Sequence, residues 1–375
     1  MATKIYTSVD GKARNVNRIY VGINGKARRV TTAYVGVNGK ARLVYKTIYK
    51  LGKVKNTQSI APISQGRDYL ASASVGNYAL FAGGSDYYVD YYYKIVDAYD
   101  SQFTHTLPDA LCTTKYDLTG GNIGNYALIV GGATKPAGAK KTISTSTVDV
   151  YDISLIRTEG TPLYAGMREG IYASNKKYAL FGGGAAGQIG DPGNTIGTAY
   201  DNSLIAHKFT TYNMGGQASG ASVGKYALFV GGLRYSEYVV AYDETLTKNW
   251  IGYTTYQRCD SVGVMTNHYA IFGGNGDLDH GVDVYDENLT KLSAADLSYV
   301  NAVSCGASLK GFGIFMVGKY VQYYDDNLTM QLSENMNEER YNAKAAIAGD
   351  YIVVAGGSKA GTSSCPTSID AYTVN

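Results

Sequence analysis

The chain has 375 residues with 45% apolar content, enough for one large all-β domain or two to three ordinary domains with a buried core. Glycine (46) and tyrosine (36) are abundant while proline (6) is rare, which favours many short strands joined by tight turns over long helices. The net charge is only +3, and no signal-peptide pattern or apolar run of membrane-spanning length occurs, so we expect no membrane insertion.

The first part of the chain is basic and repeats every 14 residues, as KIYTSVDGKARNVN, RIYVGINGKARRVT and TAYVGVNGKARLVY. Each copy places Asp-Gly or Asn-Gly between two short strands, and these dipeptides tolerate the positive φ values of a two-residue hairpin turn. We predict three hairpins over residues 1–46, in which Val21 and Arg28 share a face. Because a lone hairpin is marginally stable, this module is expected to serve attachment or oligomerisation. Nucleic-acid binding is not expected, since the basic residues alternate with turns.

A longer repeat follows, with the runs NYALFAGG, NYALIVGG, KYALFGGG, KYALFVGG, HYAIFGGN, GFGIFMVG and DYIVVAGG. Their lead aromatic residues recur at a mean spacing of about 45 residues, the period of a four-stranded propeller blade. Seven copies predict seven blades, each with a buried second strand that ends in glycines. A third strand is indicated by VDAYD, VDVYD, GTAYD, VVAYD, VDVYD, VQYYD and IDAYT, in which the aspartate after the tyrosine favours a turn.

Another repeated position lies upstream of the glycines, usually by 16 residues, and is expected to open the innermost strand of each blade. It is occupied in turn by Arg67, Lys115, Arg168, Gly215, Arg258, Asn301 and Arg340. The last copy stops at IDAYTVN, after its third strand, so its fourth strand must come from elsewhere. Residues 50 to 60 align with the fourth-strand segment of the sixth copy, and we predict that they close the seventh blade.

The order of motifs over residues 47–375 is a strand that ends in Gly-Gly, then Tyr-Asp, then a segment such as ENMNEERYNA with Arg at the next inner strand. This order resembles the Kelch repeat. The resemblance implies an all-β fold: a seven-bladed Kelch-type β-propeller closed by an N-terminal strand in the last blade and preceded by the hairpin module. Two features depart from the family pattern. Trp250 is the only tryptophan, so the usual fourth-strand Trp is missing, and the sixth copy lacks its Gly-Gly.

In the Kelch family, the loops after Gly-Gly and those entering the innermost strands line the ligand-binding face. Carried over, this implies that four arginines point toward the central mouth of that face: Arg67, Arg168, Arg258 and Arg340. An arginine ring would suit an acidic sugar, a carboxylate or an acidic peptide. The alternative is that each arginine satisfies carbonyl groups between blades.

The loops after Gly-Gly are longest in blades seven, one, two and three, with 21 to 25 residues from lead aromatic to Tyr-Asp tyrosine against 12 to 16 elsewhere. These blades are neighbours in a closed ring, so their loops should form a wall on one face, where binding is common. The blade-one loop reads SDYYVDYYY, and a tyrosine ring with its polar tip stacks well on a sugar or a protein surface. We predict ligand contacts from Tyr87, Tyr88, Tyr91, Tyr92 and Tyr93; the alternative is a loop whose tyrosines pack on each other.

No catalytic constellation stands out from the repeats, so we expect neither enzyme activity nor a cofactor. The four histidines fall at unrelated places, and the four cysteines are scattered without a C-x-x-C pair. One loop, NGDLDHG, offers Asn275, Asp277 and Asp279 like the opening of a calcium loop, but His280 stands where a glycine is expected. A polar turn is therefore favoured over a metal site.

The hairpin repeats of residues 1–46 resemble segments at the front of tail-associated and other structural proteins of phages and prophages of Gram-positive gut bacteria. This resemblance implies a virion component, assembled in the bacterial cytoplasm, that contacts other tail proteins or copies of itself through the hairpins. The propeller is then expected to bind a bacterial surface glycan or protein receptor. Two alternatives stay open: a mutarotase-like, sugar-modifying enzyme on a Kelch propeller, and an intracellular scaffold that binds an acidic peptide.

Overall fold

The computed structural model describes residues 6–375 except 10–11, 16–18, 24–25, 31, 38–39, 47–48, 56, 87–90, 137, 140, 187–192, 213, 233–236, 275–279, 300–302, 360–361 and 363. For residues 6–46, 58, 303 and 304 it describes the backbone alone. The chain divides into two compact units, Met1–Lys50 with Asn375, and Leu51–Val374. Within the described ranges, no helix has the length and apolar character needed to cross a bilayer.

The N-terminal unit contains three two-stranded antiparallel hairpins. They pair β1 (Tyr6–Val9) with β2 (Lys12–Asn15), β3 (Ile19–Ile23) with β4 (Lys26–Val30), and β5 (Thr32–Val37) with β6 (Lys40–Lys46). In the second hairpin Val21 lies opposite Arg28, which is the register that a two-residue Asn-Gly turn predicts. The predicted hairpins are therefore confirmed.

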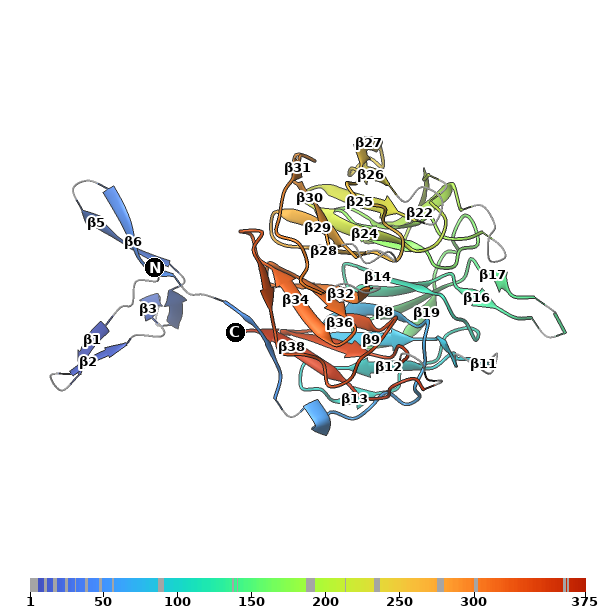
Figure 1. The fold of residues 1–375 in the computed structure, drawn as a ribbon. Coiled ribbons are helices and arrows are strands. Elements are labelled where there is room, and N and C mark those ends of the chain that lie inside the picture. Colours follow the sequence, from blue (N-terminus) through green and yellow to red (C-terminus); the bar gives the residue numbers. More distant parts are fainter. Residues whose placement is uncertain are drawn as a thin grey trace. The chain divides into compact units, whose positions relative to one another are not determined.

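The second unit is a seven-bladed β-propeller, in which seven four-stranded antiparallel sheets surround a central axis (Figure 1). Neighbouring inner strands contact each other around the whole ring, so the propeller is closed. From inner to outer strand, the first three blades are β8 (Ala71–Val75), β9 (Tyr78–Ala82), β12 (Val96–Tyr99) and β13 (His105–Thr106); β14 (Thr119–Ile123), β15 (Tyr126–Val130), β18 (Val148–Asp152) and β19 (Arg157–Glu159); and β20 (Ile171–Ser174), β21 (Ala179–Gly182), β22 (Ile196–Tyr200) and β23 (Ala206–Thr210).

The fourth to sixth blades follow the same order: β24 (Ala218–Val223), β25 (Tyr226–Gly231), β26 (Tyr238–Tyr242) and β27 (Lys248–Tyr253); β28 (Val262–Met265), β29 (Tyr269–Gly273), β30 (Val282–Asp286) and β31 (Lys291–Leu292); and β32 (Val303–Leu309), β33 (Phe312–Val317), β34 (Tyr320–Tyr324) and β35 (Met330–Leu332). The last blade consists of β36 (Lys344–Ala348), β37 (Tyr351–Ala355), β38 (Asp370–Val374) and β7 (Leu51–Lys53). The predicted seven blades are confirmed.

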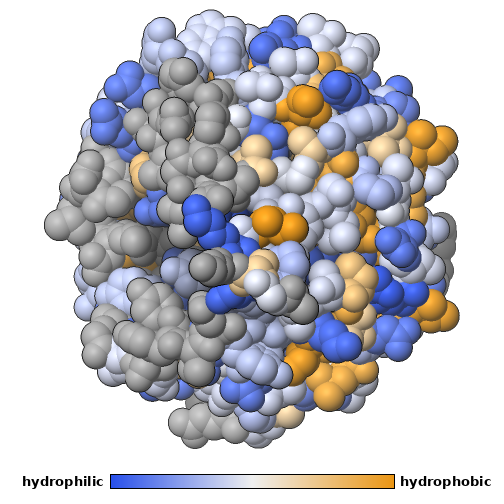
Figure 2. All heavy atoms as spheres, turned by 90° about the vertical axis from the view of Figure 1, so that its right-hand side faces the viewer, coloured by the Kyte–Doolittle hydropathy of each residue, from blue (hydrophilic) through white to orange (hydrophobic). Residues whose placement is uncertain are grey.

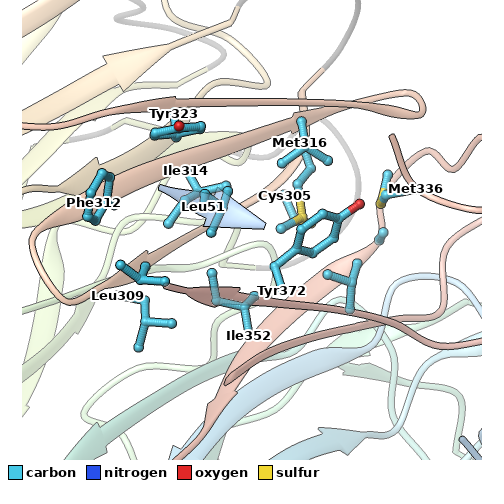
Figure 3. Packing of buried hydrophobic residues seen from close by; sticks show 14 residues of the cluster. Leu51, Cys305, Leu309, Phe312, Ile314, Met316, Tyr323, Met336, Ile352 and Tyr372 are labelled. Atoms are coloured by element: carbon cyan, nitrogen blue, oxygen red, sulfur yellow. The ribbon is translucent and has the colours of Figure 1, made fainter. Parts of the chain in front are cut away.

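The outer strand of the last blade comes from the beginning of the unit, as predicted. In β7, Lys53 pairs with Tyr372 and Leu51 with Val374, and the 3-10 turn η1 (Thr57–Ser59) follows. Leu51 is buried in the core between blades six and seven, near Ile314 (Figure 3). Since burying a leucine contributes about 1.5–3 kcal/mol, this side chain alone gives the short strand substantial stability. The pairing covers residues 51–53 of the longer predicted segment.

The repeated residues have clear local roles. Asp100 Oδ1 accepts hydrogen bonds from the backbone N–H groups of Gln102 and Thr104, both at 2.8 Å, so the aspartate after the tyrosine forms the predicted turn. The glycines that end the second strands permit close approach of the next blade. In blade four, a Cβ atom on Gly231 would collide with the carbonyl of Arg258.

Two kinds of segment meet at one end of the propeller. In blade one, Ala71 at the start of the inner strand pairs with Ala82 at the end of the second, and Ala82 pairs with Val96 at the start of the third. The loops after Gly-Gly therefore share a face, which we call the loop face, with the segments that enter the inner strands. Figure 1 shows β11, β16 and β17 on the same side; the extra hairpins are β10 (Ser85–Asp86) with β11 (Tyr91–Tyr92), and β16 (Ala133–Thr134) with β17 (Ile143–Ser144).

Candidate functional site

Six described residues, each from a different blade, surround the entrance of the central channel on the loop face. Each precedes an inner strand and has a left-handed backbone conformation, with φ between 49° and 62°. We call them the mouth ring: Tyr69, Asp117, Glu169, Gln217, Asp260 and Asn342. Together with Lys344 they line a cavity of about 400 Å³. Because the same backbone geometry recurs in each blade, six different parts of the chain direct side chains to one place.

Beneath the mouth ring, the inner strands enclose a channel of about 340 Å³. Serine, alanine and glycine dominate its walls, as at Ser72, Gly121 and Ser308. These small side chains leave space along the axis but offer few charged or aromatic groups. Among the described lining residues, the charged groups therefore lie at the mouth rather than in the channel.

Burial raises the pKa of the three carboxyl groups in the mouth ring. Asp117 is 9% exposed, and desolvation together with repulsion from Glu169 raises its pKa to about 7. Desolvation also raises the pKa of Glu169 and that of Asp260. The positive charge of Arg168 opposes the shift at both Asp117 and Glu169, and Lys344 opposes it at Asp117. Ionising these carboxyl groups therefore costs free energy unless a cation lies nearby.

A row of tyrosine rings connects the blade-one insert to the mouth ring. Tyr92 stacks on Tyr116 at a centroid distance of 4.7 Å and an interplanar angle of 16°. Tyr116 in turn meets Tyr69 of the mouth ring edge to face, at 6.4 Å and 78°. We call these three residues the tyrosine row. The insert is thus in physical contact with the central pocket through packed aromatic rings.

The five tyrosines predicted to bind ligand have different environments. Tyr91 is 61% exposed, whereas Tyr93 is buried and contacts Tyr91 edge to face at 5.0 Å. Tyr92 is half-buried in the tyrosine row, and Tyr87 and Tyr88 lie outside the described residues. On the loop face seen in Figure 2, hydrophobic residues form separate spots among hydrophilic ones. Among the described tyrosines of the insert, Tyr91 is the most exposed.

Three of the four predicted arginines form ion pairs inside their own blades. Their side chains are fully buried, and each guanidinium meets an aspartate of the third strand. The pairs are Arg67 with Asp97 (2.7 Å), Arg258 with Asp283 (2.7 Å) and Arg340 with Asp370 (3.3 Å); Lys115 pairs in the same way with Asp149 (2.7 Å). Arg67 also donates to the carbonyls of Gly83 and Phe81. These contacts join strands of one blade rather than satisfying carbonyl groups between blades, and ligand binding by these arginines stays a prediction.

Each aspartate of these pairs has a second basic partner on the fourth strand of its blade. The partners are His105 for Asp97 (2.7 Å), Arg157 for Asp149 (2.5 Å), Lys291 for Asp283 (2.8 Å) and Lys53 for Asp370 (2.8 Å). These basic groups lower the pKa of Asp149 and of Asp283, against the effect of burial. The four aspartates therefore connect the inner, third and outer strands of their blades.

The register of blade three differs from the sequence alignment. The residue that opens an inner strand accepts a hydrogen bond from a glycine of the preceding blade, as Lys115 does from Gly84 (2.8 Å). In blade three this acceptor is Met167, bonded to Gly132 at 2.7 Å, so Arg168 lies one position further along. Arg168 is 1% exposed, and its Nε has no hydrogen-bond partner among the described residues. It is the one predicted arginine whose charge acts on the mouth ring.

The structure does not test the candidate cation site, because Asn275, Asp277 and Asp279 lie outside the described residues. In the ranges that are described, no group of three or more His, Cys, Asp or Glu side chains has the arrangement needed to hold a metal ion. The carboxyl groups of the mouth ring are included in that statement.

A larger hollow of about 820 Å³ lies along the outer strand β23, beside the turn that precedes β27. Tyr164, His207 and Lys248 are among its lining residues. His207 is already paired with Asp201 at 2.9 Å, and the groove belongs to the outer edge of two blades. Because the mouth ring collects polar groups from six blades, we place the candidate site there.

The fold and the position of the site define a Kelch-like β-propeller with a pocket at the centre of its loop face. In comparisons with known proteins, no family model and no curated sequence matches the chain. A solved structure titled "Structure of YjhT" is similar, with a TM-score of 0.55 and 13% identity over 73% of this chain and 99% of the other. At this level of identity the similarity shows the fold alone.

Proposed function

We propose that this protein is a non-catalytic recognition module that binds a glycan through the mouth ring and the tyrosine row. The supporting observation is the convergence of six side chains, five of them carboxyl or amide groups, on one cavity of about 400 Å³. Carboxylates and amides hydrogen-bond to sugar hydroxyls, and tyrosine rings pack on the apolar faces of sugars. A cavity of this size accommodates a small ligand or the end of a longer one.

The proposed setting is the tail of a phage or prophage particle. The support is the resemblance of the hairpin repeats to virion structural proteins, and we propose that residues 1–46 bind other tail proteins or further copies of this chain. The propeller would then present its loop face to a bacterial surface glycan or receptor. Several copies on one particle would convert weak single contacts into strong attachment through effective concentration.

A glycan array with the full chain tests the proposal. We expect binding to a limited set of glycans, with loss of signal in the variant Gln217→Ala/Asn342→Ala, which removes two amides from the mouth ring. Tyr253→Ala is the matched control, because Tyr253 is an exposed residue on the outer strand of blade four. Absence of binding by the unmodified protein, or equal loss in the control, would contradict the proposal.

A second candidate is a sugar-modifying enzyme, and one observation favours it. Asp117 combines burial, a raised pKa and a carboxyl neighbour in Glu169, which is typical of a general acid or base. Such an enzyme would accelerate exchange between the anomers of a reducing sugar, which magnetisation-transfer NMR detects. Rate enhancement that is lost in Asp117→Asn would favour the enzyme; unchanged exchange rates would leave the recognition module.

A further inference from the structure

The three carboxyl groups of the mouth ring have no hydrogen-bond partners in the part of the chain that the structure describes. Asp117 is nine-tenths buried, lines the cavity, and neither accepts a hydrogen bond nor forms an ion pair through its side chain there. Glu169 and Asp260 line the same cavity without such contacts. Asp117 is the buried member of the three, and Glu169 and Asp260 are half-buried. A buried carboxyl group is normally hydrogen-bonded, so the donor for Asp117 has to come from whatever occupies the cavity.

The local cations compensate only part of this negative charge. Lys344 is the one basic residue among the described lining residues, against the three carboxyl groups. Arg168 lies behind the surface, and its charge acts on two of them, Asp117 and Glu169. Asp68 adds a further buried carboxyl near Lys344. When its carboxyl groups are ionised, the lining of the pocket therefore has a net negative charge.

Among the described residues, these carboxylates are not arranged as a group that could hold a single metal ion. A larger cation with several hydrogen-bond donors fits better. An ammonium group has three N–H donors and no acceptor, which complements carboxylates that have acceptors and no donor. Gln217 accepts a hydrogen bond from Cys259 through its amide oxygen, and Asn342 donates one to Asp68 through its amide nitrogen. The amide nitrogen of Gln217 and the amide oxygen of Asn342 are a donor and an acceptor suited to neighbouring hydroxyl groups.

We propose that the glycan unit seated in the mouth ring has a free ammonium group, as in an amino sugar that is not N-acetylated, bound among Asp117, Glu169 and Asp260. This inference rests on the glycan recognition proposed above and specifies its chemistry. An acidic sugar or an acidic peptide, which an arginine-lined mouth would prefer, would meet repulsion from these carboxylates. An N-acetylated sugar would lose the charge and place a methyl group against them.

Calorimetric titration of the full chain at near-neutral pH with two matched trisaccharides tests this inference. One is the β-1,4-linked trimer of glucosamine and the other is its fully N-acetylated counterpart, which differs only in the amine. We expect the glucosamine trimer to bind at least about 10-fold more tightly, since a charge-assisted hydrogen bond contributes about 1.5–3 kcal/mol. Equal affinities, or tighter binding of the acetylated trimer, would overturn the inference.

Variants locate the binding. Asp117→Asn/Glu169→Gln keeps the shape of the side chains and should reduce the affinity for the glucosamine trimer by at least about 10-fold. Asp86→Asn, in the insert hairpin of the same face, is the control and should leave the affinity unchanged. Equal losses in both variants would show a general attraction to an acidic surface and would overturn the inference.

The failure of the inference and that of the proposed function are distinguishable with a third probe, trilysine, which has ammonium groups and no sugar. Binding of the acetylated trimer alone would support glycan recognition and contradict the ammonium site. Binding of trilysine alone, if it is lost in the variant Asp117→Asn/Glu169→Gln, would support the ammonium site and contradict glycan recognition. No binding of any of the three probes would overturn the inference.

Discussion

Lys53 Nζ lies 2.8 Å from the carboxylate of Asp370 and joins the first strand of the propeller unit to the last. Asp370 also pairs with Arg340 at 3.3 Å. Asp370→Ala would leave two buried basic groups without this partner, and breaking a buried pair in this way costs about 3–5 kcal/mol. We expect a loss of that size in the free energy of unfolding, measured by urea denaturation.

The control for this prediction is Glu334→Gln, which breaks the neighbouring but exposed pair between Lys55 and Glu334. Exposed pairs contribute little, so the expected change is below about 1 kcal/mol. Similar losses in the two variants would contradict a special role for the buried contact.

The buried pair of Arg258 and Asp283 is predicted to be replaceable by a neutral pair. Where the residue that opens the inner strand is uncharged, the third-strand residue is uncharged too, as with Met167 and Thr198 in blade three. Asp283→Thr alone leaves a buried guanidinium unpaired and should cost about 3–5 kcal/mol. The double variant Arg258→Met/Asp283→Thr should recover at least half of that loss in a double-mutant cycle. Additive losses would show that the two residues are not coupled.

The stability of the protein should depend on pH through Asp117. Its pKa in the folded protein, about 7, is above the ordinary value of 3.8, so the folded state binds the proton more tightly than the unfolded state. The contribution of Asp117 to stability, relative to Asp117→Asn, is therefore fully present below about pH 4 and decreases as the pH rises toward 7. The decrease is on the order of 4 kcal/mol. Urea denaturation of both proteins across this range measures it, and a constant difference would contradict the prediction.

The insert tyrosines should separate into one that stabilises the fold and one that does not. Tyr92→Ala removes the ring stacked on Tyr116 and should lower the free energy of unfolding by about 0.5–1.5 kcal/mol. Tyr91→Ala changes a largely exposed side chain and should alter it by less than about 0.5 kcal/mol. Thermal denaturation compares them. If glycan binding uses the insert, Tyr91→Ala should weaken binding while leaving the melting temperature unchanged.

Short-range repeats made the architecture predictable from the sequence. Glycine pairs, Tyr-Asp turns and a period near 45 residues depend on local chemistry that every blade repeats, and the truncated last copy indicated the closing strand. The role of the arginines was less predictable, because it depends on a partner about 30 residues away in the chain. A signal was present: the aspartates two residues before the repeated tyrosines, such as Asp97 and Asp370, occur in the blades with a basic opening residue.

The mouth ring was harder to predict from the sequence. Its members lie two residues after each opening position but have no common chemical type, so no motif identifies them. In blade three the adjacent Met167 and Arg168 also shifted the alignment by one residue, which concealed Glu169. Whether a carboxyl group there is buried, and with which neighbours, depends on the closure of the whole ring.

The common backbone geometry of the mouth ring has an evolutionary consequence. Six positions hold five residue types in one left-handed conformation, and none of these types is branched at Cβ, the class that this conformation penalises most. A single codon change at Gln217 or Asn342 would alter the pocket without moving a strand. The chemistry of the mouth can therefore change through single substitutions among unbranched polar and aromatic residues, while the strands of the blades keep their sequence and pairing.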